Sequence, residues 1–315
     1  TAQVIPDSVA IDGKSDGARL DHYRFHVREN QVLTIEALTQ CIESAMDPVI
    51  RLLTPEGETV LLADDDGVGS ECRLRHQFSR AGDYIIEIKD SGYVAGGSYH
   101  LRIGNFPLTS HCFPLAVQRG KSTLVGVESF GNDLLPENQI VEQEWKLDVG
   151  GNLAFRFPSG TASAWRRIHV SDAPQYVEGN EESPLTCPVG ISGRLLKSGE
   201  ADEYAIAGVK DANVRFQSRT RSLGSRALLK MQLVNGQNEV VAESKVGDTD
   251  EWIFDCKFPA DGVYRLRVSD LLGRGGEGFG YYVDVMSAGS VELAFKPDAK
   301  TREPAAAPKE PLARR

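Results

Sequence analysis

Gly82-Asp83-Tyr84-Ile85-Ile86-Glu87-Ile88-Lys89-Asp90 is the stretch that decides the fold. Successive side chains of a β-strand point to opposite faces, so Tyr84, Ile86 and Ile88 would share one apolar face. The stretch has a counterpart 180 residues later, which reads Gly262-Val263-Tyr264-Arg265-Leu266-Arg267-Val268-Ser269-Asp270. The chain is therefore expected to be a β protein that contains a duplication.

Short alternating runs bounded by Gly, Asp, Asn or Pro surround this first stretch. They are His22–Val27, Val32–Ala37, Val49–Leu53 and Tyr99–Ile103. Such runs are typical of antiparallel strands with one buried face. No long stretch keeps a 3.6-residue period, although Leu135–Trp145 is compatible with one helical turn. The sequence predicts an all-β chain of sandwich type.

Three further blocks repeat in the same order along the chain. Asp21-His22-Tyr23-Arg24-Phe25 recurs as Asp202-Glu203-Tyr204-Ala205-Ile206, Arg51-Leu52-Leu53-Thr54-Pro55-Glu56-Gly57 recurs as Lys230-Met231-Gln232-Leu233-Val234-Asn235-Gly236, and Gly96-Gly97-Ser98-Tyr99 recurs as Gly276-Glu277-Gly278-Phe279-Gly280-Tyr281. A period this long means two copies of a whole domain with another segment between them. We predict one β-sandwich over residues 1–104, a small β domain over 105–175, a second sandwich over 176–288 and a disordered Pro/Ala-rich tail over 289–315.

Charge and cysteine content exclude several classes of protein. The net charge is −10, and the basic tail hides a body that is more acidic still, which disfavours nucleic acid as a partner. The five cysteines lie far apart with no C-x-x-C pair, so no zinc site is indicated. Cys41 and Cys72 could pair across neighbouring strands, but isolated cysteines are commonly small buried hydrophobes. No apolar run is long enough for a transmembrane helix.

The repeated blocks also carry a family resemblance. In the first copy they run Asp21-His22-Tyr23-Arg24-Phe25, Asp47-Pro48-Val49-Ile50-Arg51-Leu52-Leu53 with Gly57, Asp65-Asp66-Gly67, Gly82-Asp83-Tyr84 with Asp90, and Gly96-Gly97 with Tyr99. This series resembles the bacterial pre-peptidase C-terminal domain, a jelly-roll β-sandwich found beside secreted peptidases and in large bacterial surface proteins.

The second copy resembles the family less completely. It opens on Glu178-Gly179-Asn180-Glu181 and keeps Asp202, but Arg226 and Glu243-Ser244-Lys245 replace family aspartates. Between the copies, Phe113-Pro114-Leu115-Ala116-Val117-Gln118-Arg119-Gly120 resembles the opening of an immunoglobulin-like domain. The expected fold is all-β: tandem β-sandwiches in the order jelly roll, immunoglobulin-like domain, jelly roll, with a disordered C-terminal tail.

The first of two candidate calcium sites is an acidic loop. Asp47 precedes a predicted strand, and Asp64, Asp65 and Asp66 follow one another directly before Gly67. Calcium takes six to eight oxygen ligands, and clustered carboxylates could supply several of them. The alternative is an Asx-type turn whose carboxylates cap backbone amides, and of the two we favour the turn.

The second candidate site follows from the resemblance. In collagen-binding members of the family, an opening segment of this kind folds against the acid of the D-x-Y strand and holds calcium. The resemblance therefore implies metal ligands at Glu178, Asn180, Glu181 and Asp202, with Glu200 beside them. The alternative is a solvated linker in which Asp202 caps a strand end, and the sequence leaves both open. Calcium is the only cofactor expected.

No motif indicates an enzyme. The six histidines form no H-E-x-x-H, and no G-x-S-x-G is present. Gly273-x-Gly275-x-x-Gly278 matches the dinucleotide fingerprint by letter, but that site needs a helix after it. Phe279–Val285 reads instead as a strand, so we predict a hairpin loop.

The expected function is a non-catalytic extracellular binding, adhesion or spacer module of a secreted or surface bacterial protein, stiffened by calcium. The alternative is an accessory substrate-binding region of a larger secreted peptidase or other hydrolase. The expected partners are an extracellular glycan or protein polymer, or neighbouring domains of a larger chain. The expected location is secreted, periplasmic or at the cell surface.

Overall fold

The computed structural model describes residues 2–17, 19–54, 56, 59–64, 71–130, 139–158, 160–180, 184–247 and 251–288. Within these ranges the regular structure is β-strand, apart from two 3-10 helices, η1 (Gln40–Ile42) and η2 (Arg221–Leu223). The predicted all-β fold of tandem sandwiches is confirmed. The predicted tail, 289–315, lies outside the described residues.

Nine strands form the first sandwich. One sheet has the order β1-β3-β8-β5-β6, and the facing sheet has the order β2-β9-β4-β7. The strands are β1 (Gln3–Val4), β2 (Val9–Lys14), β3 (Asp21–Val27), β4 (Val32–Leu38), β5 (Pro48–Leu53), β6 (Val60–Asp64), β7 (Cys72–Gln77), β8 (Gly82–Asp90) and β9 (Ser98–Gly104). The five runs predicted here coincide with β3, β4, β5, β8 and β9 to within two residues at either end.

Alternation along the strands builds the core of this sandwich. Tyr23, Phe25 and Val27 on β3 are buried, while the side chains between them are more exposed. Ile86 and Ile88 on the neighbouring β8 face the same core. Burial of each such side chain stabilises the fold by about 1.5–3 kcal/mol, which is why the alternating pattern identifies the buried face.

The second sandwich repeats the first. Its sheets have the orders β16-β17-β24-β19-β22 and β18-β23-β20-β21. The strands are β16 (Gln175–Val177), β17 (Val189–Arg194), β18 (Ala201–Gly208), β19 (Asn213–Arg219), β20 (Leu229–Val234), β21 (Val240–Glu243), β22 (Ile253–Lys257), β23 (Gly262–Asp270) and β24 (Gly280–Ser287). The copies differ at their first strand: β1 pairs with β3, whereas β16 joins the opposite sheet and a single bridge from Leu185 to Ile206 takes the place of β1.

The middle domain has two small sheets. Their orders are β10-β12-β13 and β11-β15-β14. The strands are β10 (Leu108–Thr109), β11 (Ala116–Gln118), β12 (Ser122–Phe130), β13 (Ile140–Lys146), β14 (Gly151–Leu153) and β15 (Arg166–Ser171). The helical turn allowed near Leu135–Trp145 is wrong for residues 140–145, because pairing with β12 makes them a strand.

The Gly-rich stretch before β24 also differs from its prediction. β23 and β24 lie in different sheets, so the segment between them crosses from one sheet to the other and is no hairpin. The strand that follows it was predicted correctly, and no helix of the dinucleotide-binding kind follows Gly278.

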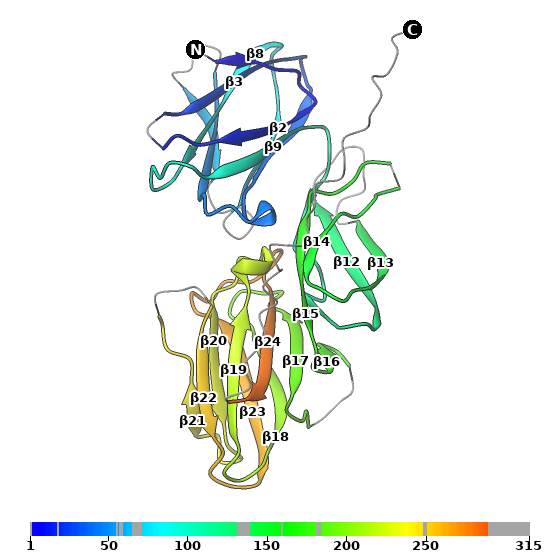
Figure 1. Cartoon of the computed structure of the whole chain (residues 1–315), viewed down its shortest axis with the longest axis vertical. Coiled ribbons are helices and arrows are strands. Elements are labelled where there is room, and N and C mark those ends of the chain that lie inside the picture. Colours follow the sequence, from blue (N-terminus) through cyan, green and yellow to red (C-terminus); the bar gives the residue numbers. More distant parts are fainter. Residues whose placement is uncertain are drawn as a thin grey trace, which may run out of the picture.

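The middle domain lies beside the junction of the two sandwiches. Figure 1 shows one sandwich above the other, with β12 to β15 alongside and the two 3-10 helices turned towards the junction. Only three residues separate the end of β15 at Ser171 from the start of β16 at Gln175, so the middle domain and second sandwich are directly joined.

Candidate functional site

Arg166 of the middle domain enters a buried acidic site in the first sandwich. Its Nη2 donates to Oε1 of Glu36 on β4 at 3.0 Å and to the Thr109 carbonyl at 3.1 Å. The two side chains are only 2% and 1% exposed, so water screens the pair very little. Burial opposes the charge on Arg166, but the carboxylates of Glu36 and Glu71 outweigh it and raise the pKa of the guanidinium.

Glu71 is the second acid of this site and has a structural role. Its Oε1 accepts hydrogen bonds from the backbone amides of Thr39 and Cys41, which begin η1. Burial raises the pKa of the Glu71 carboxyl, and nearby Arg166 opposes that rise. At η2, Glu251 accepts hydrogen bonds from the backbone amides of Thr220 and Ser222 in the same way, so both copies have this arrangement.

Several contacts around Arg166 strengthen the first interface. Nη2 of Arg102 donates to the Ala162 carbonyl at 2.9 Å, and its Nη1 lies 4.0 Å from Glu36. The ring of His100 stacks on Trp165 with centroids 5.4 Å apart. Asn152 donates to the carbonyl of Cys41 in η1. The first sandwich is thus attached to the middle domain by polar and aromatic groups.

The other end of β15 meets the second sandwich through Asp284. This carboxylate, on β24, is 3% exposed and accepts hydrogen bonds from Arg219 at 3.2 Å and from the Tyr282 hydroxyl at 2.7 Å. His169 on β15 lies with its Nε2 3.9 Å from Asp284, and its ring contacts Tyr282. One strand of the middle domain therefore contacts a buried carboxylate in each sandwich.

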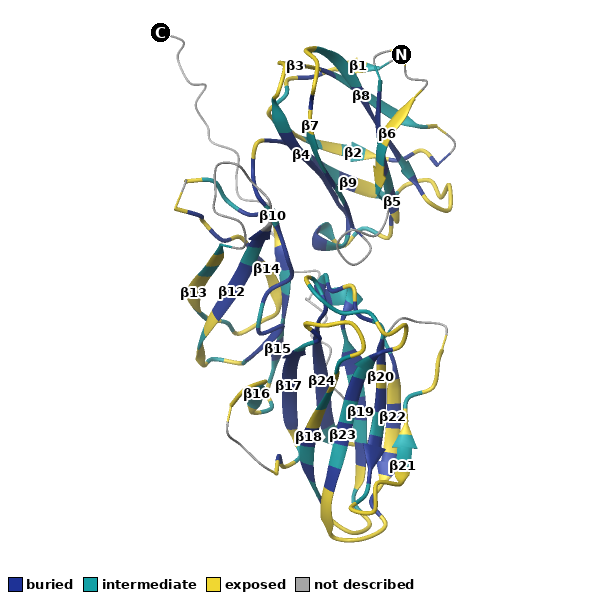
Figure 2. Cartoon of the chain, turned by 180° about the vertical axis from the view of Figure 1, so that it is seen from behind, coloured by how far each residue is buried: buried dark blue, intermediate teal, exposed yellow. Residues whose placement is uncertain are grey.

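An apolar contact accompanies the second interface. Leu115 and Ala116 of the middle domain pack with Tyr282 and with Leu223 of η2, and all four are buried. Figure 2 shows β17 and β24 as mostly dark blue ribbon beside β15, whose residues alternate between buried and intermediate. We call Arg166, Glu36, His169 and Asp284, with the groups that contact them, the three-domain junction.

The structure brings part of the predicted calcium cluster together around Asp202. Its Oδ2 accepts a hydrogen bond from the Tyr281 hydroxyl at 2.5 Å, and Tyr281 in turn contacts Tyr204. Burial raises the pKa of Asp202 to about 6, and repulsion from Glu178 and Glu200 adds to the rise. Glu178 and Glu200 are therefore close enough to Asp202 to affect its carboxyl group.

These groups are also engaged in local hydrogen bonds. Oε2 of Glu178 accepts from the amide of Arg194 at 2.8 Å, and Oε2 of Glu200 accepts from the amide of Lys197 at 2.8 Å. The carbonyl of Asn180 accepts from the Tyr176 hydroxyl. Glu181 lies outside the described residues. Among the residues that are described, no three His, Cys, Asp or Glu side chains gather as metal ligands would.

The first acidic loop is only partly described. Oδ2 of Asp47 accepts from the Ser91 hydroxyl, and Oδ2 of Asp64 accepts from the amide of Arg73 at 2.7 Å. Asp65 and Asp66 lie outside the described residues. The choice between a calcium loop and an Asx-type turn therefore stays a prediction.

The cysteines are buried or partly buried thiols. The structure has Cys41 and Cys72 as free thiols directed at different carbonyls, those of Trp165 and Pro48. Burial raises the pKa of all five thiols, to about 12 for Cys112. Because the thiolate is the nucleophile, these environments disfavour covalent catalysis by cysteine.

Sequence reasoning missed the three-domain junction. Glu36 stands in the otherwise apolar or neutral run Val32–Leu38, and a charge in such a run is the one signal that was available. A fully buried carboxylate needs a partner, so this position demands a cation from elsewhere in the chain. The identity of that cation, Arg166, depends on how the domains pack.

No family model matches the chain, and no curated protein matches it. Among solved structures, the chain is similar to the pre-peptidase C-terminal domain of a collagenase from Bacillus anthracis (18% identity, 33% of this chain and 95% of that one, TM-score 0.27). It is also similar to PliG, a periplasmic inhibitor of g-type lysozyme from Aeromonas hydrophila (12%, 33% and 97%, 0.26). A third similar structure holds tandem CBM51 modules of a family 98 glycoside hydrolase from Streptococcus pneumoniae (10%, 88% and 84%, 0.22).

At these identities and TM-scores the likenesses establish no family, and function is argued below from the chain's own residues. No helix in the described ranges is long and apolar enough to cross a membrane.

Proposed function

We propose that this chain is a non-catalytic extracellular module of a secreted or surface bacterial protein, which holds two β-sandwiches in a fixed relation for binding, adhesion or spacing. The observation that carries the proposal is the buried pair of Arg166 and Glu36 in the three-domain junction. Hinged domains usually meet at polar, solvated interfaces, whereas a buried ion pair is stable only while the interface stays closed. The junction therefore favours one relative orientation of the domains.

Side-chain chemistry supports the non-catalytic part of this proposal. Four of the six histidines lie on strands and face carboxylates: His22 with Glu87 at 3.1 Å, His26 with Asp83, His100 with Asp12, and His169 with Asp284 at 3.9 Å. The raised pKa of every cysteine thiol weakens the nucleophile that a cysteine-dependent mechanism needs. These groups are suited to structure rather than to turnover.

Calcium is proposed for the acidic edge formed by Glu178, Glu200 and Asp202. The pKa of Asp202 is raised in part by Glu178 and Glu200, a divalent cation would offset this repulsion, and Asn180 offers a further oxygen. The ion would remove repulsion beside the short connection from β15 to β16, and so stiffen the second sandwich where it leaves the middle domain.

Small-angle X-ray scattering of the whole chain tests the fixed orientation. We expect a single compact arrangement whose scattering agrees with the coordinates. The measurement is made with and without about 2 mM EDTA, which removes bound metal. A broad distribution of domain separations would overturn the rigid-module proposal. Calorimetric titration of the EDTA-treated chain with CaCl2 tests the metal separately, since no heat together with an unchanged Tm would refute calcium binding.

A further inference from the structure

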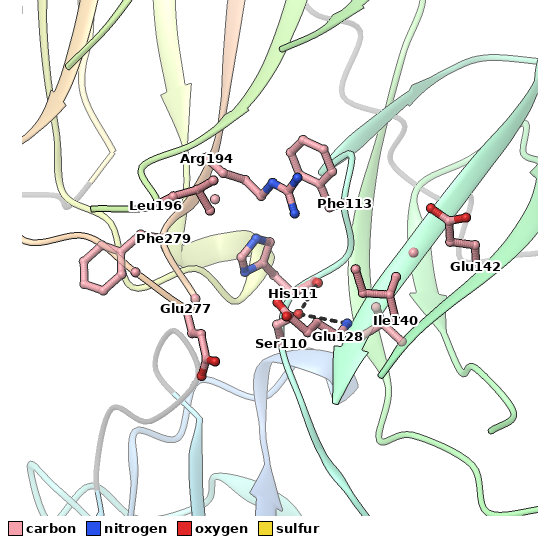
Figure 3. Close-up of a pocket in the computed structure, with 15 residues that line it drawn as sticks. Ser110, His111, Phe113, Glu128, Ile140, Glu142, Arg194, Leu196, Glu277 and Phe279 are labelled. Carbon is pink, nitrogen blue, oxygen red and sulfur yellow. Dashed lines mark hydrogen bonds between the residues drawn. The ribbon is translucent and has the colours of Figure 1, made fainter. Parts of the chain in front are cut away.

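A cavity of about 440 Å³ lies between the middle domain and the second sandwich. One wall comes from residues 110–113 with β12 and β13, and the other from the end of β17 and the Gly-rich connection before β24. Figure 3 shows His111 in the centre, Leu196, Glu277 and Phe279 on one side, and Ile140 and Glu142 on the other. The size is within the range of about 300–1,000 Å³ that is usual for small-molecule sites.

His111 provides a buried polar group without a partner. The residue is 4% exposed, and its Nδ1 has no hydrogen-bond partner in the described chain. The ring packs against Gly280, where a Cβ would collide with Nε2, so glycine is required there to admit the imidazole. Burial, reinforced by Arg194, lowers the pKa of His111 to about 3, and the ring is neutral at physiological pH. A buried imidazole nitrogen of this kind is costly unless a ligand or water pairs with it.

The charged groups of the cavity face it without ion pairs to one another. The guanidinium of Arg194 lies over the Phe113 ring at 4.2 Å and has no carboxylate within salt-bridge distance among the described residues. Across the cavity, burial raises the pKa of Glu128, and the negative charge of Glu277 raises it further. One cation, Arg194, and three carboxylates, Glu128, Glu142 and Glu277, thus line the same space.

Apolar surface completes the lining. Ile140 and Leu196 are each 56% exposed, and Phe279 lies on the same side of the cavity as Leu196. Exposed apolar side chains together with convergent polar groups are the usual composition of a ligand site. The ligand must therefore offer both an apolar face and several polar groups.

We propose that this cavity binds a neutral saccharide of one or two rings. Hydroxyl groups both donate and accept, so one sugar can donate to Glu128 and Glu277, accept from Arg194, and pair with Nδ1 of His111 in either tautomer. Its C–H face would lie on the open apolar side chains. An anion would meet more carboxylates than cations, and a purely apolar ligand would leave Arg194 and the carboxylates desolvated and unpaired.

This inference rests on the proposed binding function and gives it a location and a ligand class. The test is saturation-transfer NMR on the whole chain with a panel of neutral mono- and disaccharides of glucose, galactose, mannose and N-acetylglucosamine. Binding of at least one sugar is expected. Glu277→Ala, at an exposed position, should weaken it about tenfold or more, since a hydrogen bond to a charged group is lost.

Two further variants make the result specific. Ile140→Thr keeps a β-branched side chain on β13 but removes apolar surface, and it should also weaken binding. Glu29→Ala, at an exposed carboxylate of the first sandwich, is the matched control and should leave affinity unchanged. Absence of any sugar signal, or sugar binding that both cavity variants leave intact, would each overturn the inference. A rigid scattering profile in the same samples would keep the module proposal standing.

Discussion

Replacement of Arg166 by methionine tests the reasoning about the three-domain junction most directly. Methionine has a similar length and no charge, so the variant removes the cation while filling much of the space. Glu36 and Glu71 then remain buried, and the cations left near them include Arg102, 4.0 Å from Glu36, and Arg73. Breaking one side of a buried pair costs about 3–5 kcal/mol, which for a domain of about 100 residues lowers the Tm by roughly 12 °C or more.

The assay is urea and thermal unfolding of Arg166→Met, Glu36→Gln and the double variant. We expect the double variant to be more stable than the sum of the single losses predicts, by about 1–3 kcal/mol, because the carboxylate and the cation leave together. The deficit of Arg166→Met should also shrink as the pH falls, since the carboxylates left behind take up protons.

The matched control is Arg19→Met. Arg19 is 86% exposed and pairs with Asp16 at 3.6 Å, and such surface pairs contribute about 0–1 kcal/mol. Equal losses for Arg166→Met and Arg19→Met, or strictly additive effects of the two junction variants, would refute the view that a buried charge pair holds the first sandwich to the middle domain.

Two predictions concern the second sandwich. The pKa of Asp202 is raised to about 6 from 3.8, so ionisation of Asp202 opposes folding: this cost is absent below about pH 4 and fully present above about pH 6. Without calcium, the free energy of unfolding of Asp202→Asn should rise relative to that of the original chain by about 1–2 kcal/mol as the pH goes from 4 to 7. Urea unfolding measures this, and a difference that does not change with pH would contradict it. Gly280→Ala should lose about 1–3 kcal/mol because the new methyl group meets the His111 ring, and thermal unfolding that shows no loss would refute that close contact.

Much of each sandwich could be predicted from residues close in sequence. Alternation along β3 and β8 follows directly from the two-residue period of a strand, and both strands were located to within two residues. The repeat extended these predictions to the second copy. The prediction of a hairpin before β24 was wrong because it depended on strand pairing, which alternation does not determine. β23 pairs with β18 on one side and with β20 on the other, so the Gly-rich segment does not join two paired strands.

The candidate sites show the same division. Asp202, Glu178 and Glu200 were implied by the family resemblance and not by their spacing, and in the structure both glutamates raise the pKa of the Asp202 carboxyl. The pair of Arg166 and Glu36 joins residues that are 130 positions apart, and His111 meets Gly280 across a domain boundary. No local pattern marks either contact.

The duplication, the all-β class and the acidic body were determined by the sequence alone, because strand alternation and net charge are properties of short segments and of simple counts. Only the tertiary structure decided where the middle domain lies, which buried carboxylates β15 contacts and where the cavity opens. The physical reason is that a buried charge is stable only beside its partner, and which residue becomes that partner depends on how three separately folded cores pack together.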